Sequence, residues 1–106
     1  MSSEIIDDIC ILCGNPAQSM EYGKGNGKAF FNCSNKLCGE YLITYTAIGK
    51  IEPQNKKSYF ERTTTKEEII DTGKILVIFY HGGIKTEIKN ISDVLCKMEI
   101  SKLGFK

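Results

Sequence analysis

The most regular pattern of hydrophobic and polar positions lies in the C-terminal third of the chain. Residues 74–80 are almost all apolar and predict a buried strand, whereas residues 84–88 alternate apolar or threonine side chains with charged ones and predict a half-exposed partner. His81-Gly82-Gly83 between them favours a turn, so we expect a β-hairpin. Ser92 is placed to cap a final helix with its apolar residues on one face: Ile91, Val94, Leu95 and Met98.

Three more strands are expected in the N-terminal half. Residues 17–22 and 28–32 flank the glycine-rich segment 23–27, which is the arrangement of a second hairpin. Residues 41–48, YLITYTAI, are rich in β-branched and aromatic side chains and predict a third strand that carries Tyr41 and Tyr45 on one side. We expect these strands to form a three-stranded sheet.

A polar stretch with a proline, residues 52–57, separates the two halves. After it, Thr65 and Glu68 match a capping box, and Gly73 is placed to end the short helix that they begin. The predicted fold class is therefore mostly β, within the α+β group. We expect a module over residues 1–50, a connecting segment with the short helix over 51–74, and a hairpin plus helix over 75–106, packed together as one compact domain.

Candidate chemistry is concentrated in two cysteine pairs, each followed by glycine. Cys10 and Cys13 form C-x2-C-G, Cys33 and Cys38 form C-x4-C-G, and nineteen residues lie between the pairs. In a reducing cytosol this pattern favours a metal site over disulfides, whereas an extracellular origin would reopen that choice. Buried thiols and a redox dithiol are the other interpretations, although a redox C-x-x-C would be expected to open a helix. Cys96 is expected to pack as a small apolar side chain.

The segment from Cys10 to about Ile48 resembles the zinc-ribbon family. The resemblance comes from the two cysteine pairs with their following glycines, the hairpin between them and the strand after the second pair, including FNC…CGEYLIT. It departs from many ribbons in the longer second pair. The resemblance implies that Cys10, Cys13, Cys33 and Cys38 are the ligands of one zinc ion. Four sulfur ligands close a tetrahedral site, so this zinc is expected to be structural.

Charge and hydropathy bear on three properties of the chain: its attraction to nucleic acid, its compartment and its association with membranes. The formal net charge of +1 becomes about −1 when four cysteines ionise and one Zn²⁺ is added, which leaves no strong field to attract nucleic acid. The acidic start MSSEIIDDI has no basic region followed by a long apolar run, so we expect a cytoplasmic protein. The longest apolar run, residues 75–80, is too short to span a bilayer, and no membrane association is expected.

The expected function is that of a non-enzymatic binding module. The leading hypothesis is a protein-interaction adaptor or regulator that uses exposed strand edges and the aromatic face around Tyr41 and Tyr45, with homodimerisation through the C-terminal hairpin as a further expectation. The alternative is binding of nucleic acid by a basic and aromatic hairpin tip, composed of Lys24, Lys28, Lys36, Phe30 and Phe31. Adjacent Phe30 and Phe31 should point to opposite faces, with one of them exposed. An enzyme is the third and least favoured class, because no nucleophile relay or open metal site can be assembled.

Overall fold

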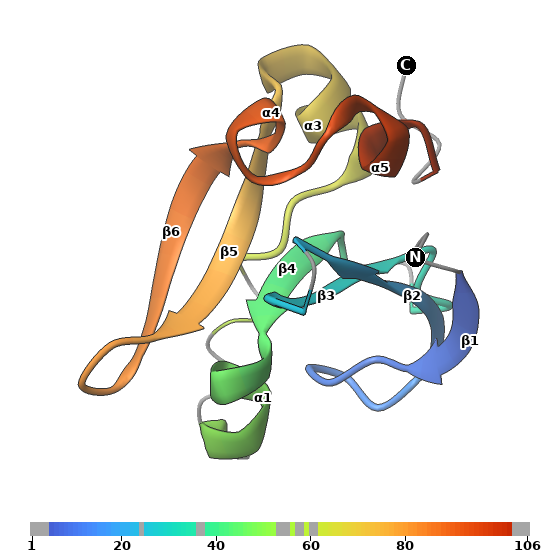
Figure 1. Ribbon diagram of the computed structural model, residues 1–106. Coiled ribbons are helices and arrows are strands. Elements are labelled where there is room, and N and C mark those ends of the chain that lie inside the picture. The colour runs from blue at the N-terminus through green and yellow to red at the C-terminus, as the bar shows by residue number, and fades with distance from the viewer. Residues whose placement is uncertain are drawn as a thin grey trace.

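The computed structural model describes residues 5–23, 25–35, 38–52, 56, 59 and 62–102, with only the backbone described at 98, 99 and 102. Within these residues, six strands form one mixed sheet in the order β1-β2-β3-β4-β5-β6 (Figure 1). All neighbouring strands are antiparallel except β4 and β5, which are parallel. The strands are β1 (Ile6–Ile9), β2 (Pro16–Tyr22), β3 (Gly27–Phe31), β4 (Tyr41–Thr44), β5 (Lys74–Tyr80) and β6 (Ile84–Asn90). The fold is thus mostly β, in the α+β class.

Short helices follow β4 and flank the β5–β6 hairpin. Helix α1 (Tyr45–Lys50) continues directly from β4, α3 (Lys66–Thr72) precedes β5, and α4 (Ile91–Val94) and α5 (Lys97–Lys102) follow β6. The predicted capping box of α3 is confirmed, with the Thr65 side chain accepting from the Glu68 amide and the Glu68 side chain accepting from the Thr65 amide. Gly73 ends this helix in the left-handed conformation. None of the helices among the described residues has the length and apolar character needed to cross a membrane.

The parallel pair β4–β5 joins the two halves of the chain into one sheet. Tyr41 is paired with Leu76 and Ile43 with Ile78. A parallel pair requires a crossover connection, and the chain between β4 and β5 contains α1 and α3. The predicted hairpins β2–β3 and β5–β6 are confirmed, and β1 adds an edge strand to the first of them.

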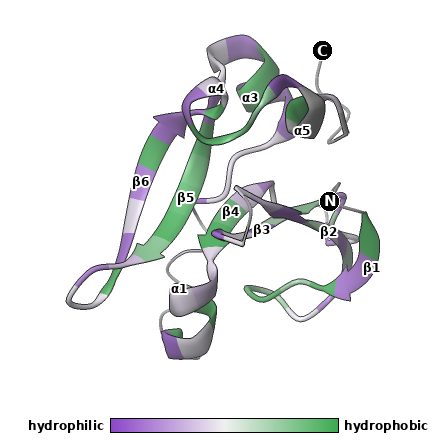
Figure 2. Ribbon diagram, viewed as in Figure 1, coloured by the Kyte–Doolittle hydropathy of each residue, from purple (hydrophilic) through white to green (hydrophobic). Residues whose placement is uncertain are grey.

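Both faces of the central strands β2 to β5 carry a hydrophobic core. One core contains Phe31, Leu42 and Val77 and is closed by residues of α3, α4 and the α4–α5 segment. The other contains Phe30, Tyr41 and Ile78 and is closed by the cysteine loops, α1 and Tyr59. Figure 2 shows the difference between a central strand and an edge strand. Strand β5 is hydrophobic over most of its length, whereas hydrophobic and hydrophilic residues alternate along β6.

Two predicted elements are wrong in extent. The strand expected over 41–48 ends at Thr44, whose side chain accepts a hydrogen bond from the Ala47 amide (3.2 Å) and so begins α1. This local cap outweighs the β propensity of the sequence that follows it. The single final helix is split at Leu95, which adopts an extended backbone and buries its side chain, and Ser92 lies inside α4 instead of capping a helix. Cys96 follows this break and is exposed, contrary to expectation.

Candidate metal centre

Two loops bring the four cysteines to one end of the sheet. The first loop joins β1 to β2 and carries Cys10 and Cys13, and the second joins β3 to β4 and carries Cys33 and Cys38. Because β2 and β3 are antiparallel, the start of β2 lies beside the end of β3. The Ser34 amide donates to the carbonyl of Pro16 (2.9 Å), which fixes the two loops to each other.

Backbone hydrogen bonds shape each loop into a tight turn. In the first, the Gly14 amide donates to the Cys10 carbonyl and the Cys10 amide to the Asn15 carbonyl, both at 2.9 Å. Gly14 has φ of +76°, a conformation that glycine adopts without strain. In the second, the Cys38 amide donates to the Asn35 carbonyl at 2.9 Å. Each turn therefore directs its two sulfur atoms toward the same point.

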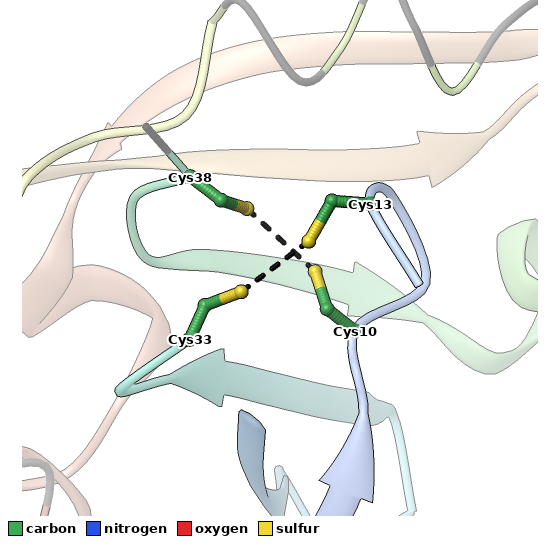
Figure 3. A group of neighbouring side chains, drawn as sticks. All are labelled: Cys10, Cys13, Cys33 and Cys38. Atoms are coloured by element: carbon green, nitrogen blue, oxygen red, sulfur yellow. Dashed lines mark hydrogen bonds between the residues drawn. The ribbon is translucent and has the colours of Figure 1, made fainter. Parts of the chain in front are cut away.

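The four Sγ atoms form a compact group, as Figure 3 shows, and all lie within 4.8 Å of one another. The Cys10–Cys38 and Cys13–Cys33 separations are 3.6 and 3.3 Å. A tetrahedral zinc with Zn–S bonds of about 2.3 Å places its sulfurs roughly 3.8 Å apart, so the cluster is close to the required size. A disulfide would need about 2.05 Å, and all four cysteines are free thiols. No histidine or carboxylate joins this group in the described part of the chain.

Tyr41 is the side chain that most directly supports the cluster. It is fully buried, its hydroxyl lies 3.2 Å from Cys10 Sγ, and it accepts a hydrogen bond from the Ile11 amide at 3.1 Å. The hydroxyl is thus oriented to donate to the sulfur. Its ring stacks on Phe30 with a centroid separation of 5.3 Å, which holds the phenol in place.

The thiols differ in their readiness to ionise. Hydrogen bonding from Cys38 lowers the pKa of Cys10, and the Tyr41 hydroxyl adds to this effect. The same pairing raises the pKa of Cys38, and burial raises the pKa of Cys33. The Cys10 pairing at Cys38 and burial at Cys33, with a smaller contribution from repulsion by nearby thiolates, thus favour the protonated form of these two thiols. A divalent cation would release these protons, since metal ligation requires thiolates.

Hydrogen bonds outside the cysteine cluster connect the Cys38 loop to the C-terminal half of the chain. The Gly39 amide donates to the Thr63 hydroxyl (2.8 Å), and Glu40 and Thr64 exchange two backbone hydrogen bonds. A side chain at position 39 would place its Cβ 2.5 Å from the Thr64 carbonyl oxygen, so this approach requires glycine. The Glu40 side chain is buried, and burial raises its pKa to about 7.

The structure corrects the predicted nucleic-acid patch. Phe30 and Phe31 do point to opposite faces, but both are buried, at 3% and 2% exposure, so the expectation that one is exposed is wrong. The reason is that distant segments cover both faces of the sheet. Lys28 forms an ion pair with Asp8 (3.1 Å). Lys24 and Lys36 lie outside the described residues.

The two tyrosines of the predicted protein-contact face, Tyr41 and Tyr45, lie in different elements and differ in exposure. Tyr41 is fully buried, so its expected role in contacting a partner is wrong. Tyr45 lies in α1, is 38% exposed, and donates its hydroxyl to the Glu21 carboxylate at 2.6 Å. Because the strand ends at Thr44, the two tyrosines do not form the continuous aromatic face that an extended strand would give.

Sequence reasoning missed Tyr41 and Glu40 as supports of the cysteine loops. Their proximity to the second cysteine pair was the available signal, but only the fold shows which way each side chain points. No family model, no curated protein and no solved structure matches this chain. The interpretation of the site therefore depends on its own chemistry, which is that of four convergent thiols able to hold a metal ion.

Proposed function

We propose that Cys10, Cys13, Cys33 and Cys38 bind one zinc ion that stabilises the fold, in the manner of a zinc ribbon. The observation that supports this most directly is the group of four sulfur atoms within 4.8 Å of one another, supplied by two loops far apart in the sequence. All-thiolate tetrahedral sites are characteristic of structural zinc, and of iron as the main competitor.

The ion would act by holding the two loops together. Four thiolates fill a tetrahedral coordination shell and leave no position for water or substrate, so the site would have no Lewis-acid chemistry to offer. Structural zinc contributes on the order of 10–16 kcal/mol of apparent binding free energy, which is comparable to the stability of a whole small domain. We therefore assign the ion to folding and not to catalysis.

Metal analysis tests this assignment. The purified protein should contain one zinc per chain by mass spectrometry under native conditions, and Co²⁺ substitution should give the absorption bands of a tetrahedral thiolate site. Cys38→Ser should lose the metal and Cys96→Ser should retain it, because Cys96 lies in a different part of the structure. Iron in place of zinc, or four cysteines that are alkylated equally fast with and without metal, would contradict the proposal.

For the protein as a whole we propose a non-enzymatic module that binds another protein in a reducing, cytoplasmic setting. Nucleic-acid binding is less favoured because Phe30 and Phe31, the aromatic residues on which bases would stack, are buried. Titration of the zinc-loaded protein with fluorescent single- and double-stranded DNA and RNA at low salt discriminates the two classes. Saturable binding that weakens steeply with salt would replace protein recognition by nucleic-acid recognition.

A further inference from the structure

Strand β6 forms one edge of the sheet (Figure 1). Two hydrogen bonds at the ends of the β5–β6 hairpin identify which of its backbone groups point outward. The Ile91 amide donates inward to the carbonyl of Gly73, and at the other end of the hairpin the His81 amide donates to the carbonyl of Gly83. In an antiparallel pair, residues alternate between facing the partner strand and facing away. Odd-numbered residues of β6 therefore bond to β5, and Ile84, Thr86, Ile88 and Asn90 direct their amides and carbonyls away from the sheet.

Two copies of β6 can be placed side by side, antiparallel and related by a two-fold axis. Their charged side chains attract each other when this axis passes through Thr86. The charged positions Lys85, Glu87 and Lys89 share one face of the strand. A two-fold axis at Thr86 places Lys85 of each copy opposite Glu87 of the other. An axis one residue further, at Glu87, would place Glu87 against itself and Lys85 against Lys89, and like charges directly opposite each other destabilise a sheet.

The apolar positions fit the same arrangement. Ile88 is 53% exposed, although Leu76, its partner on β5, is buried. An axis at Thr86 places Ile88 opposite Ile84 of the second copy, which would cover both side chains. The carbonyl of Ile84 accepts a 3.4 Å hydrogen bond from the Tyr59 hydroxyl, and its second lone pair is available for the new strand.

We propose that two copies of this chain associate through β6, antiparallel and symmetric about Thr86, so that their sheets become continuous. An axis at Ile88 would also pair opposite charges, Glu87 with Lys89. It would pair residues 86–90, directly against the end of β6 at Asn90 and the start of α4 at Ile91, and would leave Ile84 outside the paired segment. The Thr86 axis pairs residues 84–88, covers Ile84 as well as Ile88, and keeps Asn90 between the paired segment and α4. The interface is isologous, so the assembly closes at two copies.

Sedimentation equilibrium of the metal-loaded protein at low salt tests the pairing. The wild type should dimerise, and Lys85→Glu should raise the dimer dissociation constant roughly tenfold by replacing two favourable cross-strand pairs with two repulsive ones. The double variant Lys85→Glu/Glu87→Lys should restore dimerisation, because it exchanges the charges within each pair. Lys89→Glu is the matched control and should change the constant little.

The substitution Thr86→Pro tests the proposal independently, because it prevents a second strand from hydrogen-bonding to the outer edge of β6. The Thr86 amide points away from β5, so proline removes an outward donor without breaking the monomer's own ladder. It should abolish the dimer while metal content and circular dichroism stay unchanged, which separates loss of association from loss of folding.

Three results would overturn the proposal. The first is a protein that remains monomeric at roughly millimolar concentration. The second is a Lys89→Glu effect larger than that of Lys85→Glu, which would place the axis at Ile88. The third is a mass that keeps growing with concentration, which would indicate head-to-tail pairing of β6 with β1 in an open filament. None of these results depends on the identity of the metal.

Discussion

Replacing Tyr41 by phenylalanine tests whether the buried hydroxyl stabilises the cysteine cluster. The substitution removes one oxygen atom and keeps the ring, so the stacking on Phe30 and the apolar packing are retained. Two hydrogen bonds disappear, one to Cys10 Sγ at 3.2 Å and one from the Ile11 amide at 3.1 Å. The Tyr41 side chain is fully buried, so its hydroxyl is not in contact with bulk solvent.

The magnitude follows from these two contacts. A hydrogen bond to a charged group contributes about 1.5–3 kcal/mol, and a buried amide left without an acceptor costs about 1–3 kcal/mol. Ile11 is only half-buried, so the second contribution should fall near the lower end of that range. We expect Tyr41→Phe to lower the free energy of unfolding of the zinc-loaded protein by about 2–4 kcal/mol.

The assay is denaturant unfolding in a chelator-buffered solution that holds free zinc constant. Tyr45→Phe is the matched control, because it removes the same atom from a 38% exposed tyrosine that is bonded to Glu21 and should cost less than about 1 kcal/mol. In the Co²⁺-substituted protein, Tyr41→Phe should also move the sulfur-to-metal charge-transfer band to longer wavelength, since a sulfur that loses a hydrogen-bond donor holds its electrons less tightly. Equal stability losses in the two variants together with an unmoved band would refute the role assigned to Tyr41.

Four further substitutions test the surrounding fold. Gly27→Ala should be strongly destabilising in thermal unfolding, because its Cβ would lie 2.2 Å from a β4 carbonyl oxygen, whereas Gly49→Ala has open space in a helix and should stabilise by about 0.5–1 kcal/mol. Asp8→Ala should cost about 1–2 kcal/mol at neutral pH by leaving the buried Ser19 hydroxyl without its acceptor. Burial favours a higher pKa for Asp8, but hydrogen bonds, led by that from Ser19, bring it below 3.8, so the Asp8 contribution is full above that pH and is lost as the pH falls through the folded pKa. Thr65→Ala should cost about 1 kcal/mol in denaturant unfolding, since it removes the N-cap hydrogen bond from the Glu68 amide, which is one half of the capping box.

Features set by neighbouring residues were predictable from the sequence. The cysteine spacings indicated the metal-binding group, turn residues defined both hairpins, and Thr65 with Glu68 and Gly73 located α3 at both ends. In each case, a few adjacent side chains and backbone groups determine the local geometry. The cysteine cluster could be expected for the same reason, because each pair forms its own tight turn and needs only one hairpin to meet the other.

Features set by distant segments were not predictable in this way. Phe30 and Phe31 alternate as strand residues should, but their burial depends on Tyr59, the cysteine loops and the C-terminal helices, which pack on opposite faces. The parallel pairing of β4 with β5 likewise joins residues far apart in the chain, and no local signal distinguishes it from two separate sheets. The predicted strand over residues 41–48 was wrong for a local reason. The Thr44 side chain caps helix α1, and this cap outweighs the high β propensity of the residues that follow.

The connections around Cys38 bear on how far the effect of the metal extends. From this cysteine, Gly39 and Glu40 bond to Thr63 and Thr64, and the Thr64 hydroxyl accepts from the Leu76 amide in β5 at 3.1 Å. The second cysteine loop is thus held both by the proposed zinc and by the strand that joins the two halves. Loss of the metal would release these contacts together, because the residues that follow Cys38 lead directly into β4. The unit that a bound ion would stabilise is therefore the whole six-stranded sheet, and we expect chelation to unfold the C-terminal hairpin in the same transition as the cysteine loops.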